Sequence, residues 1–367
     1  MLKGYSKPND CYHSVLSSIP NIVEKNPRIV DLALLGSHDS FTHLISKNSR
    51  SADNAPGIVK LVSRTLLKNF AVRYSKTQLV GAYEQLMAGV RYFDVRLHYA
   101  NNTFMTKHSL ISGLFAEFIT EILKFLDEHQ GEVVVFRFYN WKYRDKGQPY
   151  LIDFLRSVSY KGKTLLDYIY YKTRDAGHFD TAGLTDTPYT PQKLELLTDY
   201  DKAEGIYLTD LTYNDVTKNG KESGVVMYGW ERKEGESIPD CFYADGYEKA
   251  RWLHTSDMND AFAKMDKEVV EMALYYNDIT KHLFRVNQAN LCLSTKSLKH
   301  MIYVIKGRSL INMANNFNPV FIEHKNFDVW HKAMPCIWVD FATCNNGDFN
   351  NKINKKIIVY NTKLCSK

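Results

Sequence analysis

The sequence has few cysteines, and their placement excludes two kinds of site. No two of them have the close, paired spacing of a zinc site, and they are too sparse for a dense disulfide framework. We therefore expect reduced thiols in an intracellular chain, because disulfides persist mainly in oxidising compartments. The six cysteines are Cys11, Cys241, Cys292, Cys336, Cys344 and Cys365.

Long apolar runs are also absent. Nowhere do about eighteen apolar residues stand together, so no segment is predicted to span a bilayer. The amino terminus is polar and lacks the basic-then-apolar order of a secretory signal. Leu2 stands where myristoylation needs glycine. We expect a cytoplasmic or peripherally membrane-associated chain.

No internal repeat, low-complexity tract or clean linker divides the 367 residues, so a single domain over 1–367 is expected. Hydrophobic residues make up 44% and charged residues 24%, a globular composition. A formal charge of +6 favours anionic partners only weakly. The basic residues are dispersed apart from 60–76 and no nucleic-acid motif is present, so a nucleic-acid partner is not expected.

The rest of the chain is organised around residues 31–42. The apolar residues 32–35 predict a short buried strand, which Gly36 ends. His38 and Asp39 then lie at the carboxyl edge of that strand, where α/β proteins carry their chemistry. The alternative is an ordinary loop in which Asp39 and Ser40 cap the next helix.

A second stretch favours chemistry over capping. Residues 88–97 predict a strand after a helical run at 82–87, and alternation places Asp94 and Arg96 on one face. Such charges are costly to bury unless they pair or meet a charged ligand. Residues 105–110 add a second histidine, His108, near the same edge. With His38 and Arg96, it completes a general base, a general acid and a cation for phosphodiester cleavage.

These stretches resemble the phosphatidylinositol-specific phospholipase C catalytic (X-type) domain. The resemblance rests on residues 36–40 (Gly-Ser-His-Asp-Ser), 89–96, 107–110 and 132–138, in family order and at family-like spacing. It is strongest over 28–140. Residues 337–341 are similar to the family's last barrel strand. The sequence is most similar to the metal-independent branch, which includes bacterial enzymes, a glycosyl-phosphatidylinositol-cleaving lipase and animal X-domain-only proteins.

The resemblance implies a distorted TIM-type α/β barrel with largely parallel strands. It implies a phospholipase C in which His38 deprotonates the inositol 2-hydroxyl and His108 protonates the departing diacylglycerol oxygen. Inositol 1,2-cyclic phosphate is the second product. Arg96 would stabilise the phosphorane, Asp340 would orient His38, and Asp39 and Asp94 would position Arg96 and His108 or the attacking hydroxyl.

Arg96 argues against a metal. Calcium-dependent relatives surround the phosphate with carboxylates, since calcium takes about six to eight oxygen ligands. Here a guanidinium stands where one carboxylate is expected, so we expect no metal and no cofactor. Two alternatives stay open: a metal-dependent phosphodiesterase of glycerophosphodiesters or sphingomyelin, and a non-catalytic inositol-lipid binding module.

Four further residues are candidates for binding the substrate, which is a phosphoinositide or a glycosyl-phosphatidylinositol. Arg137 lies inside an apolar strand, Gln78 precedes the helical run, and Trp230 and Gln288 end later strands. Each also has an ordinary interpretation as a surface or core residue. Ala289 and Leu291 depart from the bacterial pattern, which leaves headgroup recognition open. The sequence does not fix the oligomeric state.

Residues 57–76 are apolar and basic and contain no acidic residue. They predict either a barrel-wall helix with a solvated basic edge or a peripheral membrane contact beside the site. Further helices are expected at 114–126, 151–158, 257–283 and 296–317, the last ended by Asn318 and Pro319. We also expect a loop or lid at 173–190, and an accessory strand at 357–360 because of its β-branched residues.

Overall fold

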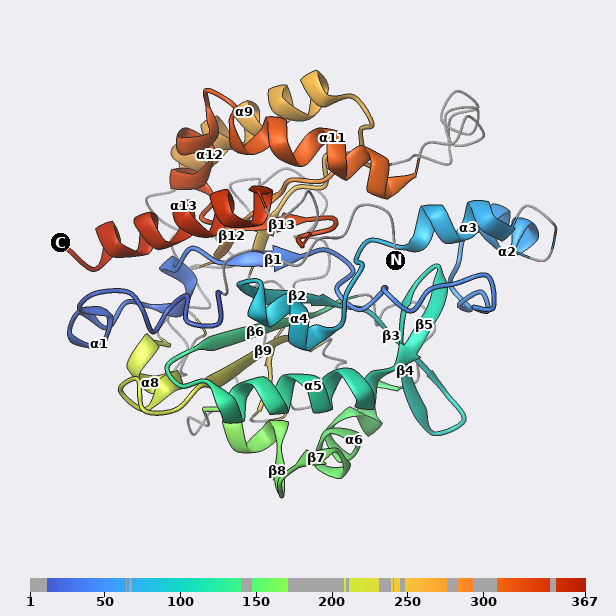
Figure 1. Cartoon of the computed structure of the whole chain (residues 1–367), viewed down its shortest axis with the longest axis horizontal. Helices are drawn as coiled ribbons and strands as arrows, with labels where there is room; N and C mark the ends of the chain where they lie inside the picture. The colour runs from blue at the N-terminus through green and yellow to red at the C-terminus, as the bar shows by residue number, and fades with distance from the viewer. Residues whose placement is uncertain are drawn as a thin grey trace.

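The apolar stretches form one curled sheet whose pairings are all parallel among the described residues (Figure 1). The computed structural model describes residues 12–63, 65, 68–139, 147–170, 208, 211–230, 239, 241–244, 248–275, 283–292, 309–343 and 348–367. Across the sheet the eight strands are β10 (Tyr243–Ala244), β9 (Gly224–Trp230), β6 (Val133–Phe138), β2 (Val90–Val95), β1 (Leu35–Ser37), β13 (Cys336–Val339), β12 (Phe284–Gln288) and β11 (Glu248–Ala250).

The strand order is that of a barrel with one seam. The last strand, β13, pairs with the first, β1, with Leu35 opposite Ile337 and Ser37 opposite Val339. Following the sheet from β1 in the other direction leads through β2, β6 and β9 to β10. In the part of the chain that is described, no ladder joins β10 to β11. The prediction of a distorted barrel with largely parallel strands is confirmed, and β13 is the expected last strand.

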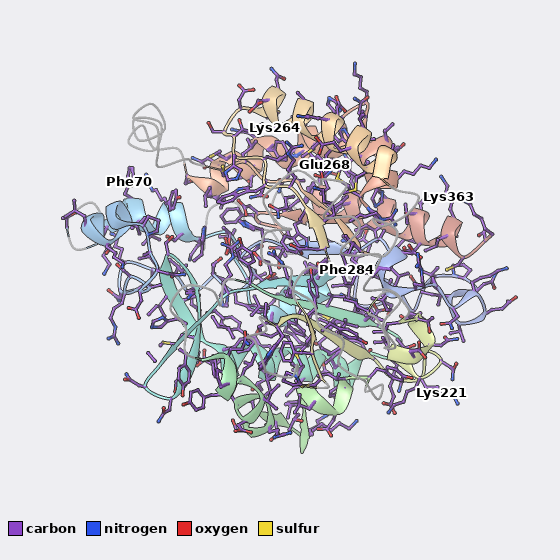
Figure 2. The ribbon with its side chains drawn as sticks, turned by 180° about the vertical axis from the view of Figure 1, so that it is seen from behind. Phe70, Lys221, Lys264, Glu268, Phe284 and Lys363 are labelled. Atoms are coloured by element: carbon purple, nitrogen blue, oxygen red, sulfur yellow. The ribbon has the colours of Figure 1, made fainter. Side chains whose placement is uncertain are left out.

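Helices cover the outside of the sheet (Figure 1). The helix α5 (Phe115–Glu128) packs against α4 (Ala82–Met87), and it buries Phe118, Ile122 and Leu126 at helical spacing. On the opposite side lie α9 (Met258–Tyr275), α11 (Leu310–Ile322), α12 (Phe327–Ala333) and α13 (Asp348–Leu364). Figure 2 shows Phe284 near the centre of the molecule, with Lys221, Lys264 and Lys363 at its periphery.

Smaller elements connect the strands and helices of the barrel. Two helices and an antiparallel sheet among them lie near the site: α2 (Gly57–Val62), α3 (Lys68–Ser75), and the sheet of β3 (Leu97–Ala100), β4 (Thr103–His108) and β5 (Leu110–Leu114). The arrow of β1 points toward these elements in Figure 1, so they flank the carboxyl edge of the barrel. The others are α1 (Ile22–Lys25), α6 (Leu151–Ser157), α8 (Tyr213–Thr217), the hairpin of β7 (Ser159–Tyr160) and β8 (Lys163–Thr164), and the 3₁₀ turns η1 (Ile29–Asp31), η2 (Gln148–Tyr150) and η3 (Leu165–Tyr168).

The accessory strand predicted at 357–360 is wrong, because these residues belong to the helix α13. Its buried face includes Ile353 and Ile357, but it also includes three asparagines. Asn350 and Asn354 donate to the carbonyl oxygen of Ala88, and Asn361 bonds both backbone groups of Ala33. The sequence shows no clear helical period of apolar residues here, because several inward-facing positions of α13 are polar.

The helix end predicted at Asn318 and Pro319 is also wrong. The helix α11 runs through both residues to Ile322. The Asn318 side chain is buried and donates to the carbonyl oxygen of Asp340 at 3.0 Å. Tertiary contact therefore holds the helix through a proline that would weaken it in isolation.

Several predictions fall wholly or partly on residues outside the described ranges. They are the loop or lid at 173–190, the first part of the helix at 296–317, the last part of the helix at 257–283, and the state of Cys11 and Cys344. The described cysteines Cys241, Cys292, Cys336 and Cys365 form no disulfide bond. Of the helices in the described ranges, none combines the length and apolar character needed to cross a bilayer.

Gly36 allows β1 and β13 to pack closely at the site. A Cβ at this position would lie 2.2 Å from Cδ1 of Trp338, which is fully buried. The Trp338 ring also packs edge-to-face on Tyr92, with ring centroids 5.0 Å apart. The glycine before His38 is therefore required by packing inside the barrel.

We predict that Gly36→Ala destabilises the fold by about 1–3 kcal/mol, the usual cost of overpacking a core. Gly57→Ala is the matched control, since no atom lies within 4 Å of its added Cβ. Urea unfolding of both variants measures the free energies. A loss below about 0.5 kcal/mol in Gly36→Ala, no larger than surface substitutions give, would contradict the packing argument.

Candidate active site

The end of β1 delivers His38 to the carboxyl edge of the barrel. The His38 backbone N–H donates to the carbonyl oxygen of Val339 in β13 at 3.1 Å. The chain then turns sharply, with Asp39 in the left-handed region at φ 44°, a conformation that aspartate tolerates better than most residues. The Ser40 hydroxyl donates to the carbonyl oxygen of Ser37 and closes the turn. His38 and Asp39 thus leave the strand in fixed directions.

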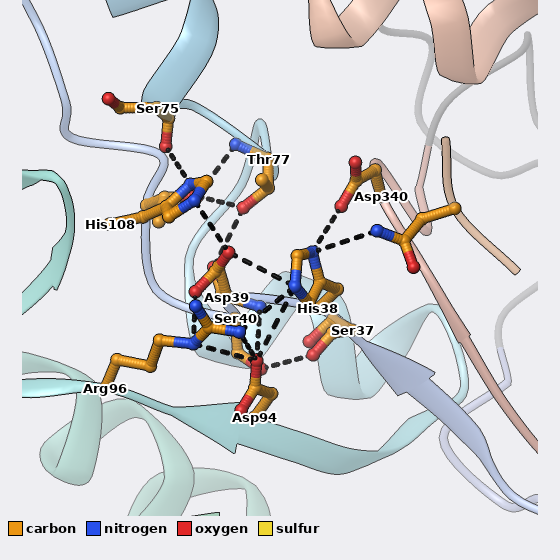
Figure 3. Close-up of polar contacts among 12 residues, drawn as sticks. Ser37, His38, Asp39, Ser40, Ser75, Thr77, Asp94, Arg96, His108 and Asp340 are labelled. Atoms are coloured by element: carbon orange, nitrogen blue, oxygen red, sulfur yellow. Dashed lines mark hydrogen bonds and ion pairs between the residues drawn. The ribbon is translucent and has the colours of Figure 1, made fainter. Parts of the chain in front are cut away.

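His38 is oriented by Asp340, which follows β13. The two residues are far apart in sequence, but His38 Nδ1 lies 2.8 Å from Asp340 Oδ1. An Nδ1–H donated to this carboxylate leaves Nε2 facing the centre of the site (Figure 3). The carboxylate expected to hold His38 in one tautomer is therefore in place.

Arg96 joins two carboxylates that are completely buried. Its Nε lies 2.6 Å from Asp39 Oδ1, and its Nη2 lies 3.0 Å from Asp94 Oδ2. The same Asp94 oxygen accepts the backbone N–H of Asp39 at 3.1 Å. Arg96 Nη2 also lies 3.1 Å from His38 Nε2. A single guanidinium therefore touches the first histidine and both of its neighbouring acids.

His108 reaches the same point from the antiparallel sheet. It ends β4, and its Nδ1 lies 3.0 Å from the carbonyl oxygen of Ser75 at the end of α3. Because a carbonyl only accepts, Nδ1 carries a proton and Nε2 points inward. That Nε2 lies 3.3 Å from Asp39 Oδ2, and His38 Nε2 lies 3.4 Å from the same oxygen. Asp39 thus stands between the two histidines.

The buried charges shift the two histidines in opposite directions. Burial opposes protonation of His38, but Asp39 and Asp340 outweigh it and raise the pKa of His38 to about 9. Burial lowers the pKa of His108, and the positive charges of Arg96 and His38 act in the same direction against Asp39. At neutral pH these shifts place the proton on His38 and leave His108 neutral in the unliganded site.

The carboxylate of Asp94 remains ionised. Burial alone favours its neutral form, but Arg96 and Arg137 hold its pKa at about 2. Burial opposes the charge of Arg96, whereas Asp39 and Asp94 raise its pKa.

Of the four substrate-binding candidates, Gln78 and Arg137 lie at the cluster but are engaged by the protein. Gln78 is buried, donates to the carbonyl oxygens of His38 and Val339, and accepts the Ala342 N–H, so it braces β1 against β13. Arg137 Nη1 lies 3.5 Å from Asp94 Oδ1.

The other two candidates lie away from these contacts. The Trp230 ring is buried and packs on Phe242, with centroids 4.9 Å apart. Gln288 ends β12 and is half-buried.

The structure adds residues that no sequence motif marks. Glu248 in β11 ion-pairs with Arg137, and Asn290 Nδ2 lies 3.5 Å from His38 Nδ1. The Tyr139 ring lies under both guanidinium groups, 5.1 Å from that of Arg96 and 4.1 Å from that of Arg137. Tyr139 could have been found from the sequence, because it directly follows a predicted strand. Glu248 could not, because its strand is too short to give a hydrophobic pattern.

Comparisons with known proteins give partial sequence matches and one shared fold. The chain is 29% identical over 141 residues to PI-PLC X domain-containing protein 1 of Danio rerio, and 32% identical over 133 residues to protein 2 of Homo sapiens. These matches cover 36% and 35% of this chain. Over this stretch the chain is similar to PI-PLC X domain-containing proteins. It spans less than half the length of these relatives, 45% and 43%. No family model matches it.

Solved bacterial structures share the fold over nearly the whole chain. Two structures of the phosphatidylinositol-specific phospholipase C of Staphylococcus aureus superpose with TM-scores of 0.55 and 0.52. They cover 94% and 95% of this chain and 98% and 99% of the bacterial ones, at 14% and 16% identity. The chain therefore has the fold of these bacterial proteins.

We predict that Asp340→Asn lowers the pKa of His38. Since folding raises this pKa from 6.5 to about 9, protonated His38 stabilises the wild type fully below pH 6.5. This stabilisation is lost as pH rises through 9, and the loss should be smaller in Asp340→Asn. NMR titration of His38 and unfolding at both pH values measure the effect. His331, which lies in α12, should titrate unchanged, and an unchanged His38 would contradict the pairing.

Proposed function

We propose that this chain is a metal-independent phospholipase C, acting as one catalytic barrel over residues 1–367. It would act on phosphatidylinositol or a glycosylated inositol lipid. The observation that carries the proposal is the meeting of His38, His108 and Arg96 around Asp39, with three carboxylates holding them in place. The sequence similarity and the shared fold support the same class of reaction.

The reaction begins with the proton on the inositol 2-hydroxyl. His38 Nε2 takes this proton while the hydroxyl oxygen bonds to the adjacent phosphorus. Arg96 turns from its carboxylates toward the phosphate oxygens, where a planar fork stabilises the negative charge of the phosphorane. The phosphorus–glycerol bond breaks as His108 Nε2 gives its proton to the leaving oxygen. Diacylglycerol and inositol 1,2-cyclic phosphate result, and one proton has moved from His108 to His38.

Hydrogen bonding supports these roles for the two histidines. Arg96 Nη2 can donate to His38 Nε2 only when that nitrogen carries no proton, which is the form of a general base. His108 has an acceptor on each side, the Ser75 carbonyl and Asp39, and so can use both of its protons. The pKa shifts of the unliganded site put the proton on His38, so in the proposed reaction this proton has to pass to His108 when the substrate binds, before His38 acts as the base.

Metal independence rests on the same guanidinium. His38, Asp39 and Asp94 offer ligand atoms within 4.8 Å of one another, so they are a cluster that can be tested for metal binding. They supply two carboxylates and one imidazole, short of the oxygens that calcium requires. Arg96 is already paired with both carboxylates and would repel a divalent ion. The donor set therefore does not suit calcium, and any divalent ion would have to displace Arg96 from both carboxylates.

We predict that the wild type releases diacylglycerol and cyclic inositol phosphate from phosphatidylinositol vesicles in excess chelator. His38→Ala and His108→Ala should each lose about 10²–10⁴ in rate, the usual value of acid–base assistance. On a nitrophenyl inositol phosphate, whose leaving group needs no proton, His108→Ala should recover activity and His38→Ala should not. Product analysis by phosphorus NMR gives the rates.

Each alternative outcome has a separate meaning. Activity that requires an added divalent ion would replace the proposal with a metal-dependent phosphodiesterase. Recovery of His38→Ala instead of His108→Ala would reverse the two roles. Vesicle binding without turnover would leave a non-catalytic inositol-lipid module, and a glycosylated anchor tested beside phosphatidylinositol would decide the headgroup.

We also propose that α2 and α3 contact the membrane beside the site. The span 57–76 has no acidic residue, Leu61 in α2 is 64% exposed, and Arg73 in α3 is exposed. The site lies next to it, because Ser75 at the end of α3 accepts from His108. Basic residues on such a surface attract anionic lipid by about 1 kcal/mol each.

We predict that Lys68→Glu with Arg73→Glu weakens binding to anionic vesicles by about 10²-fold or more at low salt. The control reverses Lys221 and Lys363, which lie elsewhere on the surface (Figure 2). Vesicle flotation measures both double variants. Equal losses in the two would show a general charge effect instead of a contact at α3.

A further inference from the structure

We infer that Glu248 is a positioning residue that closes the open seam of the barrel and holds the catalytic carboxylate Asp94 through Arg137. For its kinetic effect the inference rests on the proposed function. The structural effect of Glu248 does not depend on the proposed function. Neither the motifs of the sequence nor the comparisons point to this residue.

Glu248 bridges strands that the sheet keeps far apart. It lies in β11, at one edge of the sheet, whereas Arg137 lies in β6 and Tyr228 in β9, toward the other edge. Its Oε1 lies 2.5 Å from Arg137 Nη2, and its Oε2 accepts the Tyr228 hydroxyl at 2.6 Å. Because no ladder in the described ranges joins β10 to β11, these side-chain bonds tie the two arms across the interior.

The interior around this bridge is closed to solvent. The Tyr228 hydroxyl is also hydrogen-bonded to that of Tyr92 in β2, and both rings pack against Phe284. Tyr92 and Tyr228 are fully buried, and Glu248 is 3% exposed. Burial and Glu248's charge together raise the pKa of both tyrosines well above the usual value, so both hydroxyls remain donors. A carboxylate in such a place is costly unless its charge is compensated.

Arg137 connects Glu248 to the active site. One end of its guanidinium meets Glu248, and the other meets Asp94 Oδ1 at 3.5 Å. The other Asp94 oxygen binds Arg96. The charges therefore alternate along Glu248, Arg137, Asp94 and Arg96. Without Glu248, the whole charge of Arg137 would act on Asp94 and compete with Arg96 for it.

The test replaces Glu248 with glutamine, which keeps the shape and removes the charge. We expect Glu248→Gln to lower kcat on phosphatidylinositol by about 10-fold to 100-fold, as displacement of a catalytic group by about 1 Å does. KM should change much less, because Glu248 acts through Arg137 and Asp94 and not on the lipid. Glu248→Asp, which keeps the charge, should recover part of the loss.

The matched control is Glu268→Gln. Glu268 is equally buried and pairs with Lys249 and Arg251 beside the same strand, but none of its ion pairs reaches the site. It should leave kcat within about twofold while lowering the unfolding temperature. Equal losses of kcat in Glu268→Gln and Glu248→Gln would reduce the role of Glu248 to stability and overturn the inference.

A double variant tests the route through Arg137. If Glu248 acts by restraining Arg137, Glu248→Gln should cost little further kcat in an Arg137→Met background. Fully additive losses would contradict that route.

Hydrogen exchange tests the seam whether or not the chain turns over lipid. Glu248→Gln should speed exchange in both β11 and β9, and Glu268→Gln should leave β9 unchanged. Unchanged exchange in β9 of Glu248→Gln would overturn the bridge. If the wild type has no activity but the variants show this exchange pattern, the proposed function is refuted and the bridge made by Glu248 across the seam is still supported.

Discussion

The arrangement of the active site depends on the two ion pairs of Arg96. Asp39 and Asp94 are both fully buried, and their charges would repel each other and demand water without a cation between them. Removing one partner of a buried pair costs about 3–5 kcal/mol, because the other charge stays uncompensated. Arg96 therefore holds the loop after β1 to the end of β2 before any substrate arrives. In the proposed reaction the same guanidinium turns to the phosphate.

Both polar and apolar side chains of the barrel hold the active-site residues in position. Gln78 ties the backbones of β1 and β13 together, and Trp338 fills the space that Gly36 leaves. Glu248 and Arg137 extend the alternation of charge toward the seam. A buried ionic chain adds little net stability but favours one geometry, since each charge lies beside a charge of opposite sign. Such a scaffold suits a reaction that needs a base and an acid at fixed separation.

Local patterns were enough where one element carried the information. The apolar run around Arg137 predicted β6, and the period of residues 114–126 predicted α5. The strand predicted at 32–35 was misplaced, because β1 is Leu35–Ser37 and runs through Gly36. The strand predicted at 357–360 failed because α13 turns asparagines inward to meet backbone groups of other elements. Hydrophobic periodicity does not reveal a buried helix face when polar residues on that face form hydrogen bonds with residues distant in the sequence.

The sequence by itself determined the chemistry available: two histidines, an arginine and several carboxylates placed after strands, in the order of a known family. Only the tertiary structure decided how they combine. It placed Asp340 against His38 from the far end of the chain, and it brought Ser75 to His108 and Glu248 to Arg137. These pairings join residues from different strands and loops, so no spacing along the chain encodes them. The pKa of His38 follows from the same contacts, because burial and charge exist only once the barrel has folded.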